Sequence, residues 1–163
     1  MRALNCRFII SLVVAALLVG CAGVTTPSRH NALDYTKYDA AIEGGDLVTV
    51  KALTNENREI VNDRGWGDTT PLILAAQNDQ TQIAQFLIDK GANVNASAKG
   101  GATALHIAAQ KNNRALAKLL LVYKANVNAT DAQGRTATDR AIEWHHSDMA
   151  EFLRTQGGKS LKH

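Results

Sequence analysis

The stretch Thr103-Ala104-Leu105-His106-Ile107-Ala108-Ala109 decides the fold, because related stretches stand 33 residues before it and 33 residues after it. Thr70-Pro71-Leu72 precedes it by that interval, and Thr136-Ala137-Thr138 follows it. The same spacing separates the pairs Ala75-Ala76, Ala108-Ala109 and Ala141-Ile142, and the pairs Val61-Asn62, Val94-Asn95 and Val127-Asn128. A fixed period of this length indicates a stack of similar supersecondary units.

Each unit is predicted to begin with a short inner helix. Thr70 has the type and place of an N-cap whose hydroxyl accepts from first-turn amides, and Pro71 stands where a missing N–H costs nothing. Leu72, Ala75 and Ala76 then form a narrow apolar face. Because alanine is small, this face predicts close stacking on the next unit.

A second, outer helix follows in each unit. In the second unit its apolar face consists of Ile83, Phe86, Leu87 and Ile88. Gly91 then ends the helix, where a left-handed residue is needed. Lys124 replaces this glycine in the third unit, at a cost of several tenths of a kcal/mol if the position stays left-handed.

The repeated stretch resembles a known family. Residues 103–109 resemble the Thr-Pro-Leu-His-x-Ala core of ankyrin repeats, and Gly91-Ala92-Asn93-Val94-Asn95-Ala96 resembles their Gly-Ala-Asp-Val-Asn-Ala turn. The resemblance covers residues 32–163. It implies an all-α solenoid of about four helix-turn-helix repeats with short β-hairpin loops. One unit cannot bury both of its helices, so about three or more must stack.

The period divides residues 32–163 into four units, and the two end units depart from the pattern. The units are 32–64, 65–97, 98–130 and 131–163. In the first, an inner helix is expected near residues 38–44 and an outer helix near residues 47–53. In the last, Thr138, Arg140 and Arg154 replace apolar residues of the second and third units. These polar groups are expected to face solvent, as in a cap that no further repeat covers.

Residues 1–20 have the pattern of a signal peptide. Arg2 and Arg7 precede an apolar run, residues 8–19, that is shorter than the ~20 residues needed to span a bilayer. Leu18-Val19-Gly20-Cys21 resembles the lipobox of bacterial lipoproteins, which implies cleavage before Cys21 and acylation of its thiol. The alternative is a buried first helix with an incidental cysteine.

The lipobox assigns the chain to a compartment. Residues 21–31 become a lipidated cysteine with a flexible tether, and Ala22 after the cysteine favours the outer membrane, facing the periplasm. Cys6 leaves with the signal peptide, so a disulfide scaffold is excluded. The formal net charge is +3, and without a Lys/Arg run or basic stripe no nucleic-acid partner is expected.

Histidines are the main candidates for chemistry. His106 is either a catalytic base or a structural imidazole that bonds the Thr103 hydroxyl and neighbouring hairpins, and we favour the structural role. Adjacent residues such as His145 and His146 rarely bind one ion, and the sequence lacks an accompanying ligand pattern. Gly100-Gly101 is interpreted as a hairpin turn. We therefore expect no metal, no cofactor and no catalytic residue, with a hydrolase using His145 or His146 as a distant alternative.

The resemblance also implies a binding face, because partners of ankyrin proteins usually lie against hairpin tips and the exposed side of the inner helices. The matching tip positions are Trp66, Thr69, Lys99, Ala102, Gln133 and Arg135. The matching inner-helix positions are Gln77, Asn78, Gln110, Lys111, Glu143 and Trp144. Tyr123 stands at a further contact position near the end of its outer helix. Exposed Trp and Tyr are frequent binding hot spots. The alternative is that Trp66 packs on its own hairpin and Trp144 caps the last helix pair.

These expectations describe a membrane-tethered module, monomeric when unbound, that binds a periplasmic protein. Small lipidated ankyrin proteins resemble immunity proteins paired with secreted antibacterial lipases or phospholipases, which implies that this chain inhibits a toxic enzyme. Alternatively it is an accessory or scaffold factor for a periplasmic enzyme such as a catalase.

Overall fold

The computed structural model describes residues 32–65 and 68–161. The predicted signal peptide (1–20) and the segment 21–31 with Cys21 lie outside these residues, as does Trp66. The helices pair in chain order: α2 (Ala32–Glu43) with α3 (Leu47–Glu56), α4 (Pro71–Gln77) with α5 (Thr81–Asp89), α6 (Ala104–Gln110) with α7 (Arg114–Val122), and α8 (Ala137–Glu143) with α9 (Ser147–Thr155). The predicted all-α solenoid of about four repeats is confirmed.

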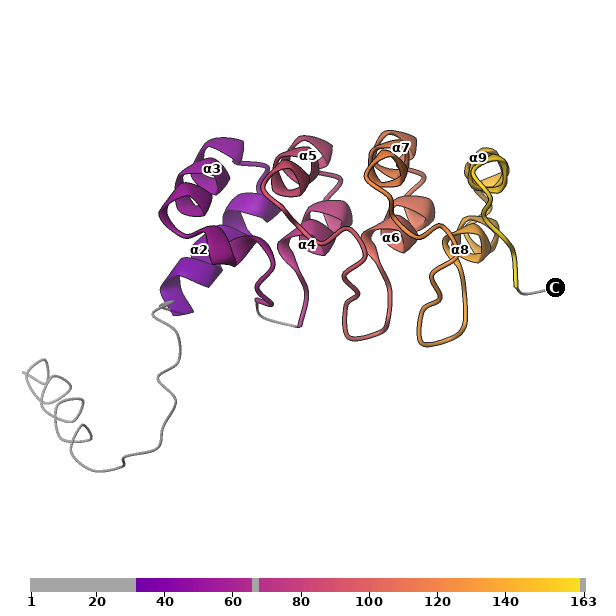
Figure 1. The fold of residues 1–163 in the computed structure, drawn as a ribbon, viewed down its shortest axis with the longest axis horizontal. Helices are drawn as coiled ribbons and strands as arrows, with labels where there is room; N and C mark the ends of the chain where they lie inside the picture. The colour runs from indigo at the N-terminus through magenta and orange to yellow at the C-terminus, as the bar shows by residue number, and fades with distance from the viewer. Residues whose placement is uncertain (1–31, 66–67, 162–163) are drawn as a thin grey trace, which may run out of the picture. The chain divides into compact units, whose positions relative to one another are not determined.

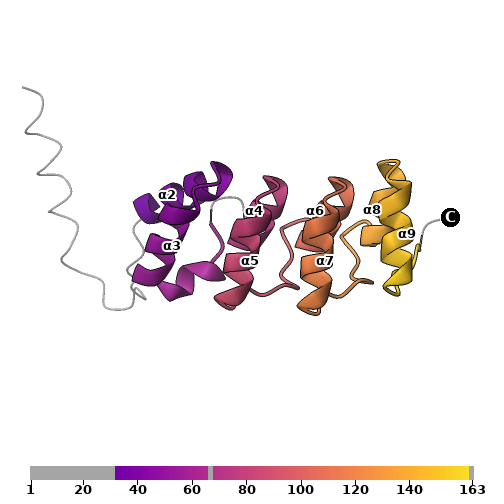
Figure 2. The same cartoon turned by 90° about the horizontal axis from the view of Figure 1, so that it is seen from above.

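The helix pairs stand in a row from the first unit to the fourth (Figure 1). The inner helices α2, α4, α6 and α8 form one layer, and the outer helices α3, α5, α7 and α9 form the other (Figures 1 and 2). Long loops extend from the inner layer on the side away from the outer helices (Figure 1). None of the helices in the described part of the chain is long and apolar enough to cross a membrane.

The core runs through the row between the two layers. Ala75, Ala76, Ala108 and Ala109 on the inner helices are fully buried, which allows the close stacking predicted from their small size. Large side chains fill the space toward the outer helices: Leu72, Ile83, Leu87, Leu105, Leu116, Leu120, Met149 and Leu153 are all at most 1% exposed. Residues 31–163 therefore form a compact unit with a core of their own.

Three predicted turns have the expected backbone. Gly91 follows α5 with a φ of 94°, and Lys124 occupies the equivalent left-handed position after α7 with a φ of 66°. Gly101 has a φ of 74° in a tight hairpin turn, where the amide of Ala98 donates to the carbonyl of Ala102 at 2.9 Å. An antiparallel bridge between Ser97 and Thr103 closes this hairpin.

Three asparagines at 33-residue intervals tie each unit to the next. The side-chain oxygen of Asn62 accepts from the amide of Asn93 at 2.7 Å. The same bond recurs from Asn95 to the amide of Asn126 and from Asn128 to the amide of Lys159, both at 2.8 Å. Each asparagine also donates from its side-chain nitrogen to a carbonyl of the following turn, those of Gly91, Lys124 and Gly157. The repeated Val-Asn pair therefore marks a connection between neighbouring units.

The first unit differs from its predicted helices. α2 begins at Ala32, six residues before the expected start at 38, and α3 continues to Glu56 before a short 3-10 helix, η1 (Arg58–Val61). The Thr-Pro start of the second unit has no counterpart here, and residues 32–43 contain neither glycine nor proline. Nothing in the local sequence therefore interrupts α2 over this range.

The last unit corrects the prediction of a solvent-facing cap. Thr138 is fully buried, and Arg140 donates to Asp131 of its own unit and to Gln110 of the third unit. Among the three polar replacements, Arg154 is exposed as expected. For Arg140 the error arises because an ion pair and a hydrogen bond hold its side chain. For Thr138 it arises because the segment after α9 covers the side chain. The helical period encodes neither effect.

The segment after α9 explains the burial of Thr138. The hydroxyl of Thr136 donates to the carbonyl of Lys159 at 2.7 Å, and the hydroxyl of Ser160 donates to Asp139 at 2.6 Å. The amide of Leu161 also donates to Asp139, at 3.2 Å. These bonds hold the C-terminal segment against α8, so that Gly158 lies directly beside Thr138.

Thr70 does not form the predicted cap bond. Its backbone is extended, as at an N-cap, but its buried hydroxyl has no hydrogen-bond partner among the residues that the structure describes. The equivalent hydroxyls of Thr103 and Thr136 bond the side chains three residues later, His106 and Asp139. The second unit has Ile73 at that position, which offers no polar atom.

Candidate functional site

We call the surface formed by the inner helices and the hairpin tips the tip face. Within the described residues it contains the predicted positions Thr69, Gln77, Asn78, Lys99, Ala102, Gln110, Lys111, Gln133, Arg135, Glu143 and Trp144. Six of them are exposed, namely Gln77, Lys99, Lys111, Gln133, Glu143 and Trp144, and the other five are partly buried. The tip position Trp66 lies outside the described residues.

The structure joins tip and helix residues at the C-terminal end of the tip face. Arg135, on the hairpin before α8, reaches Glu143 on that helix at 3.2 Å and Asp131 at 2.9 Å. Arg140 of α8 approaches the same Asp131 oxygen at 2.8 Å and donates to Gln110 of α6 at 2.9 Å. Several predicted positions therefore belong to one bonded network across two units.

Asp131 is the centre of this network. Its side chain is completely buried, and it accepts from the backbone amides of Gln133 and Arg135 in addition to the two guanidinium groups. Burial works to raise the pKa of the Asp131 carboxyl, but the bonds from Arg135 and Arg140 outweigh it and hold that pKa well below its usual range. The hairpin tip is thus held by a permanently ionised carboxylate at neutral pH.

Trp144 provides the exposed aromatic surface of the tip face. It is the C-cap residue of α8, and 53% of its surface is accessible to solvent. The residue therefore lies at the end of α8, and about half of its surface remains available to a partner. Large exposed aromatic side chains are frequent anchors in protein interfaces.

Tyr123 is not brought together with the tip face. It is the C-cap residue of the outer helix α7, and its hydroxyl donates to Asp89 at 2.8 Å. The same hydroxyl accepts from the side-chain amide of Gln85 on α5 at 3.0 Å. Tyr123 therefore connects two outer helices.

The geometry around His106 matches the structural role. Nδ1 accepts from the backbone amide of Thr103 at 3.2 Å and lies 2.9 Å from the Thr103 hydroxyl. Nε2 therefore carries the proton and donates to the carbonyl of Arg135 at 2.9 Å. Burial lowers the pKa of the imidazole despite this carbonyl, so the ring is neutral at pH 7. His106 thus connects the third unit to the hairpin of the fourth.

The two adjacent histidines are placed differently. His145 is exposed with a left-handed φ of 59°, whereas the Nε2 of His146 lies 3.0 Å from the carbonyl of Gln110. Among the described residues, no three His, Cys, Asp or Glu side chains come close enough together to hold a metal ion.

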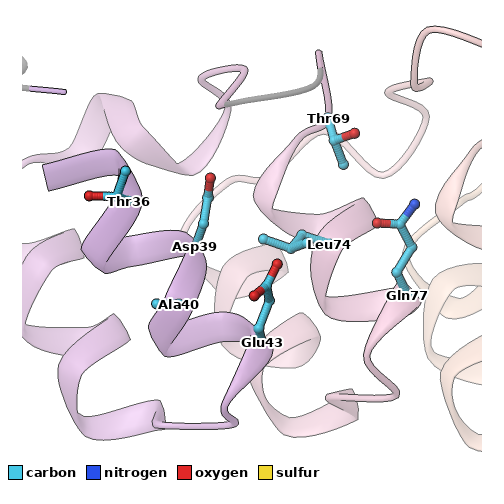
Figure 3. A pocket seen from close by; sticks show the side chains of 7 residues that line it. All are labelled: Thr36, Asp39, Ala40, Glu43, Thr69, Leu74 and Gln77. Atoms are coloured by element: carbon cyan, nitrogen blue, oxygen red, sulfur yellow. The ribbon is translucent and has the colours of Figure 1, made fainter. Parts of the chain in front are cut away.

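Sequence reasoning missed a hollow between α2 and α4, which opens on the tip face. We call it the α2/α4 hollow; its volume is about 330 Å³. It is lined by Thr36, Asp39, Ala40, Glu43, Thr69, Leu74 and Gln77. Figure 3 shows Asp39 and Glu43 on the α2 side, with Leu74 extending toward them from α4. Burial and the neighbouring Glu43 raise the pKa of Asp39. In the sequence, the i, i+4 spacing of Asp39 and Glu43 places both carboxylates on one side of a helix. The first unit departs from the repeat pattern, so its residues could not be aligned with those of the other units to locate this hollow.

Charge is divided unevenly along the row of repeats. Residues 32–64 contain seven Asp or Glu and four Lys or Arg, whereas residues 98–130 contain five Lys or Arg and no Asp or Glu. The α2/α4 hollow thus involves the acidic first unit, and the exposed tip residue Lys99 belongs to the basic third unit.

Comparisons with known proteins agree with this architecture. A family model described as ankyrin repeats in three copies matches residues 12–98, 37–131 and 97–162. A putative ankyrin repeat protein of Rickettsia bellii (strain RML369-C) is 35% identical over 74 residues, which cover 44% of this chain and 11% of the relative. Alpha-latrocrustotoxin-Lt1a of Latrodectus tredecimguttatus is 42% identical over 52 residues, which cover 32% of this chain and 4% of the toxin. The chain spans only a small part of either relative.

Proposed function

The chain belongs to the ankyrin-repeat family, whose repeats form protein–protein interaction modules, and we propose that its tip face binds a protein in the envelope of a bacterium. The observation that carries this proposal is the combination of exposed side chains with a bonded framework beneath them. Trp144, Gln133 and Glu143 are exposed, while Asp131 and Arg135 fix the adjoining hairpin.

The rigidity of the framework favours tight binding. Binding to a preformed surface costs less conformational entropy than binding that must first order a loop. The hairpin before α8 is held by Asp131, and the hairpin before α6 lies one unit away in the same stack. Contacts with the partner therefore contribute to affinity with little loss of conformational entropy in the hairpins.

We propose further that the protein is held at the membrane by acylated Cys21 and faces the periplasm. The support is the sequence Leu18-Val19-Gly20-Cys21 after an apolar run and two arginines. Ala22 after the cysteine favours the outer membrane. Several acyl chains on one residue anchor a protein far more firmly than a single chain.

Within this location, we propose that the partner is a toxic enzyme, such as a secreted antibacterial lipase or phospholipase, and that binding inhibits it. A rigid, non-covalent binding face suits an inhibitor because it occludes an enzyme without chemistry of its own. The lipid anchor keeps the inhibitor in the compartment where such an enzyme would arrive.

The test is capture of the partner from solubilised envelope with the tagged full chain, followed by mass spectrometry and activity assay. We expect one protein to co-purify in stoichiometric amount and to lose its enzymatic activity when the purified chain is added. A partner whose activity is unchanged by saturating amounts of the chain contradicts the inhibitor role. Failure of any protein to co-purify contradicts the binding function itself.

A further inference from the structure

The α2/α4 hollow combines an apolar interior with acidic groups, and this combination suits one kind of side chain. Leu74 and Ala40 supply apolar surface, while Asp39 and Glu43 supply carboxylates on the α2 side (Figure 3). We propose that this hollow receives a lysine or arginine side chain from the protein partner. The inference rests on the proposed protein-binding function and names the chemistry of one contact.

The shape of such a side chain fits the lining. Lysine and arginine carry an aliphatic stem that packs on apolar surface and a charged head that stays with polar groups. Leu74, extending from α4, provides surface for the stem, and the carboxylates provide acceptors for the head (Figure 3). The amide of Gln77 and the hydroxyl of Thr69 add further polar groups around the opening.

The electrostatics favour a cation from outside. None of the seven lining residues is a lysine or arginine. Asp39 and Glu43 stand four residues apart on one helix, an arrangement in which like charges repel each other. Burial raises the pKa of the Asp39 carboxyl, and the charge of Glu43 adds to this effect. An incoming cation relieves the repulsion and gains two acceptors at once.

The lining residues also suit an organic cation better than a metal ion. The two carboxylates are the anionic groups of the hollow, and Leu74 occupies its α4 side. Calcium takes six to eight oxygen ligands, which this mixed lining does not offer. A volume of about 330 Å³ suits an elongated side chain better than a single ion.

The test uses a small probe, so that it needs no partner. The compact unit 31–163, labelled with ¹⁵N, is titrated with N-acetyl-arginine methylamide and, separately, with the neutral citrulline analogue. We expect saturable shifts of the backbone amides around Asp39, Glu43 and Leu74 with the arginine probe only. Equal shifts with citrulline, equal shifts with calcium chloride, or no shift at these positions would overturn the proposal.

Two matched double variants test whether binding of the arginine probe requires the carboxylates of the hollow. Asp39→Asn/Glu43→Gln should weaken binding of the arginine probe at least tenfold, while the dispersed amide spectrum shows that the domain stays folded. Asp148→Asn/Glu151→Gln removes the same charge from exposed positions of α9 and should leave binding unchanged. Equal losses in both variants would show non-specific attraction and overturn the proposal. Because envelope capture tests the binding function separately, a partner captured by a chain that ignores the probe contradicts this inference alone.

Discussion

Threonine is the N-cap residue of three inner helices, and in each case the side chain three positions later determines whether the threonine hydroxyl has a hydrogen-bond partner. His106 bonds Thr103, and Asp139 bonds Thr136. Ile73 offers the buried hydroxyl of Thr70 no polar atom, and within the described part of the chain this hydroxyl has no hydrogen-bond partner. A buried polar group without a hydrogen bond costs free energy, whereas a bonded one contributes a modest net gain.

Replacing the two threonines by valine should therefore have different effects. Thr70→Val removes an unsatisfied hydroxyl and should change the free energy of unfolding by less than about 0.5 kcal/mol, or raise it. Thr103→Val deprives His106 of a bonded partner and should cost about 1–3 kcal/mol. Urea melts of both variants measure the difference. A larger loss for Thr70→Val than for Thr103→Val would show that the hydroxyls are assigned wrongly.

Asp139 predicts a pH dependence of stability. Burial works to raise the pKa of its carboxyl, but the bonds from Ser160, Thr136 and Leu161 outweigh it and lower that pKa to about 2. The unfolded chain has the ordinary value near 3.9, so the stabilisation is complete above that value and is lost as the pH falls toward 2. A shift of this size corresponds to about 2 kcal/mol.

The measurement compares the natural chain with Asp139→Asn in urea melts between pH 7 and pH 2.5. The natural chain should be more stable at pH 7, and the gap should narrow as the pH falls below 4. A gap that stays constant over this range would mean that the Asp139 carboxylate does not hold the C-terminal segment.

At the scale of the helix, the ends of α5 and α7 show how one position is used by two residue types. Gly91 and Lys124 both have left-handed backbone, which glycine adopts without strain and lysine does not. Lys124→Gly should therefore raise the free energy of unfolding by roughly 0.5–1 kcal/mol. Lys118→Gly, at an exposed position inside α7, should lower it by about 1 kcal/mol. Thermal melts that shift in the same direction for both variants would contradict the role of the left-handed turn.

The helices that sequence could predict are those that carry the full repeat pattern. Units two to four have their inner helix after a threonine and their outer helix ending at a left-handed residue, so α4 to α9 could be predicted from the period of 33. α2 lacks the Thr-Pro start, and its early beginning could not be read from the period. The burial of Thr138 depends on bonds to the segment after α9, which no helical period describes.

The candidate site likewise has residues that the repeat period predicted and residues that it did not. The period placed Gln77, Gln133, Glu143 and Trp144 at exposed positions of the tip face, because those positions recur in every unit. It did not place the α2/α4 hollow, since that hollow depends on the irregular first unit. The buried Asp131 was also missed, because two arginines at unrelated spacings combine to hold it.

At the scale of the molecule, the row of repeats presents one face with an exposed tryptophan. Trp144→Ala should weaken binding of the captured partner by more than about 1 kcal/mol, as expected for an aromatic anchor. It should change the thermal melt little, because the side chain is more than half exposed. Titration calorimetry and circular dichroism measure the two effects. An early melt with unchanged affinity would identify Trp144 as a packing residue.

The central claim is that the tip face, and not the outer-helix face, binds the partner. The most direct measurement is site-specific photo-crosslinking in living cells, with benzoylphenylalanine introduced at Gln77, Trp144 or Lys118 of the full chain. Gln77 and Trp144 belong to the tip face, and Lys118 is exposed on α7. The account predicts that positions 77 and 144 crosslink to the same protein and that position 118 does not. A crosslink from position 118 alone would contradict it.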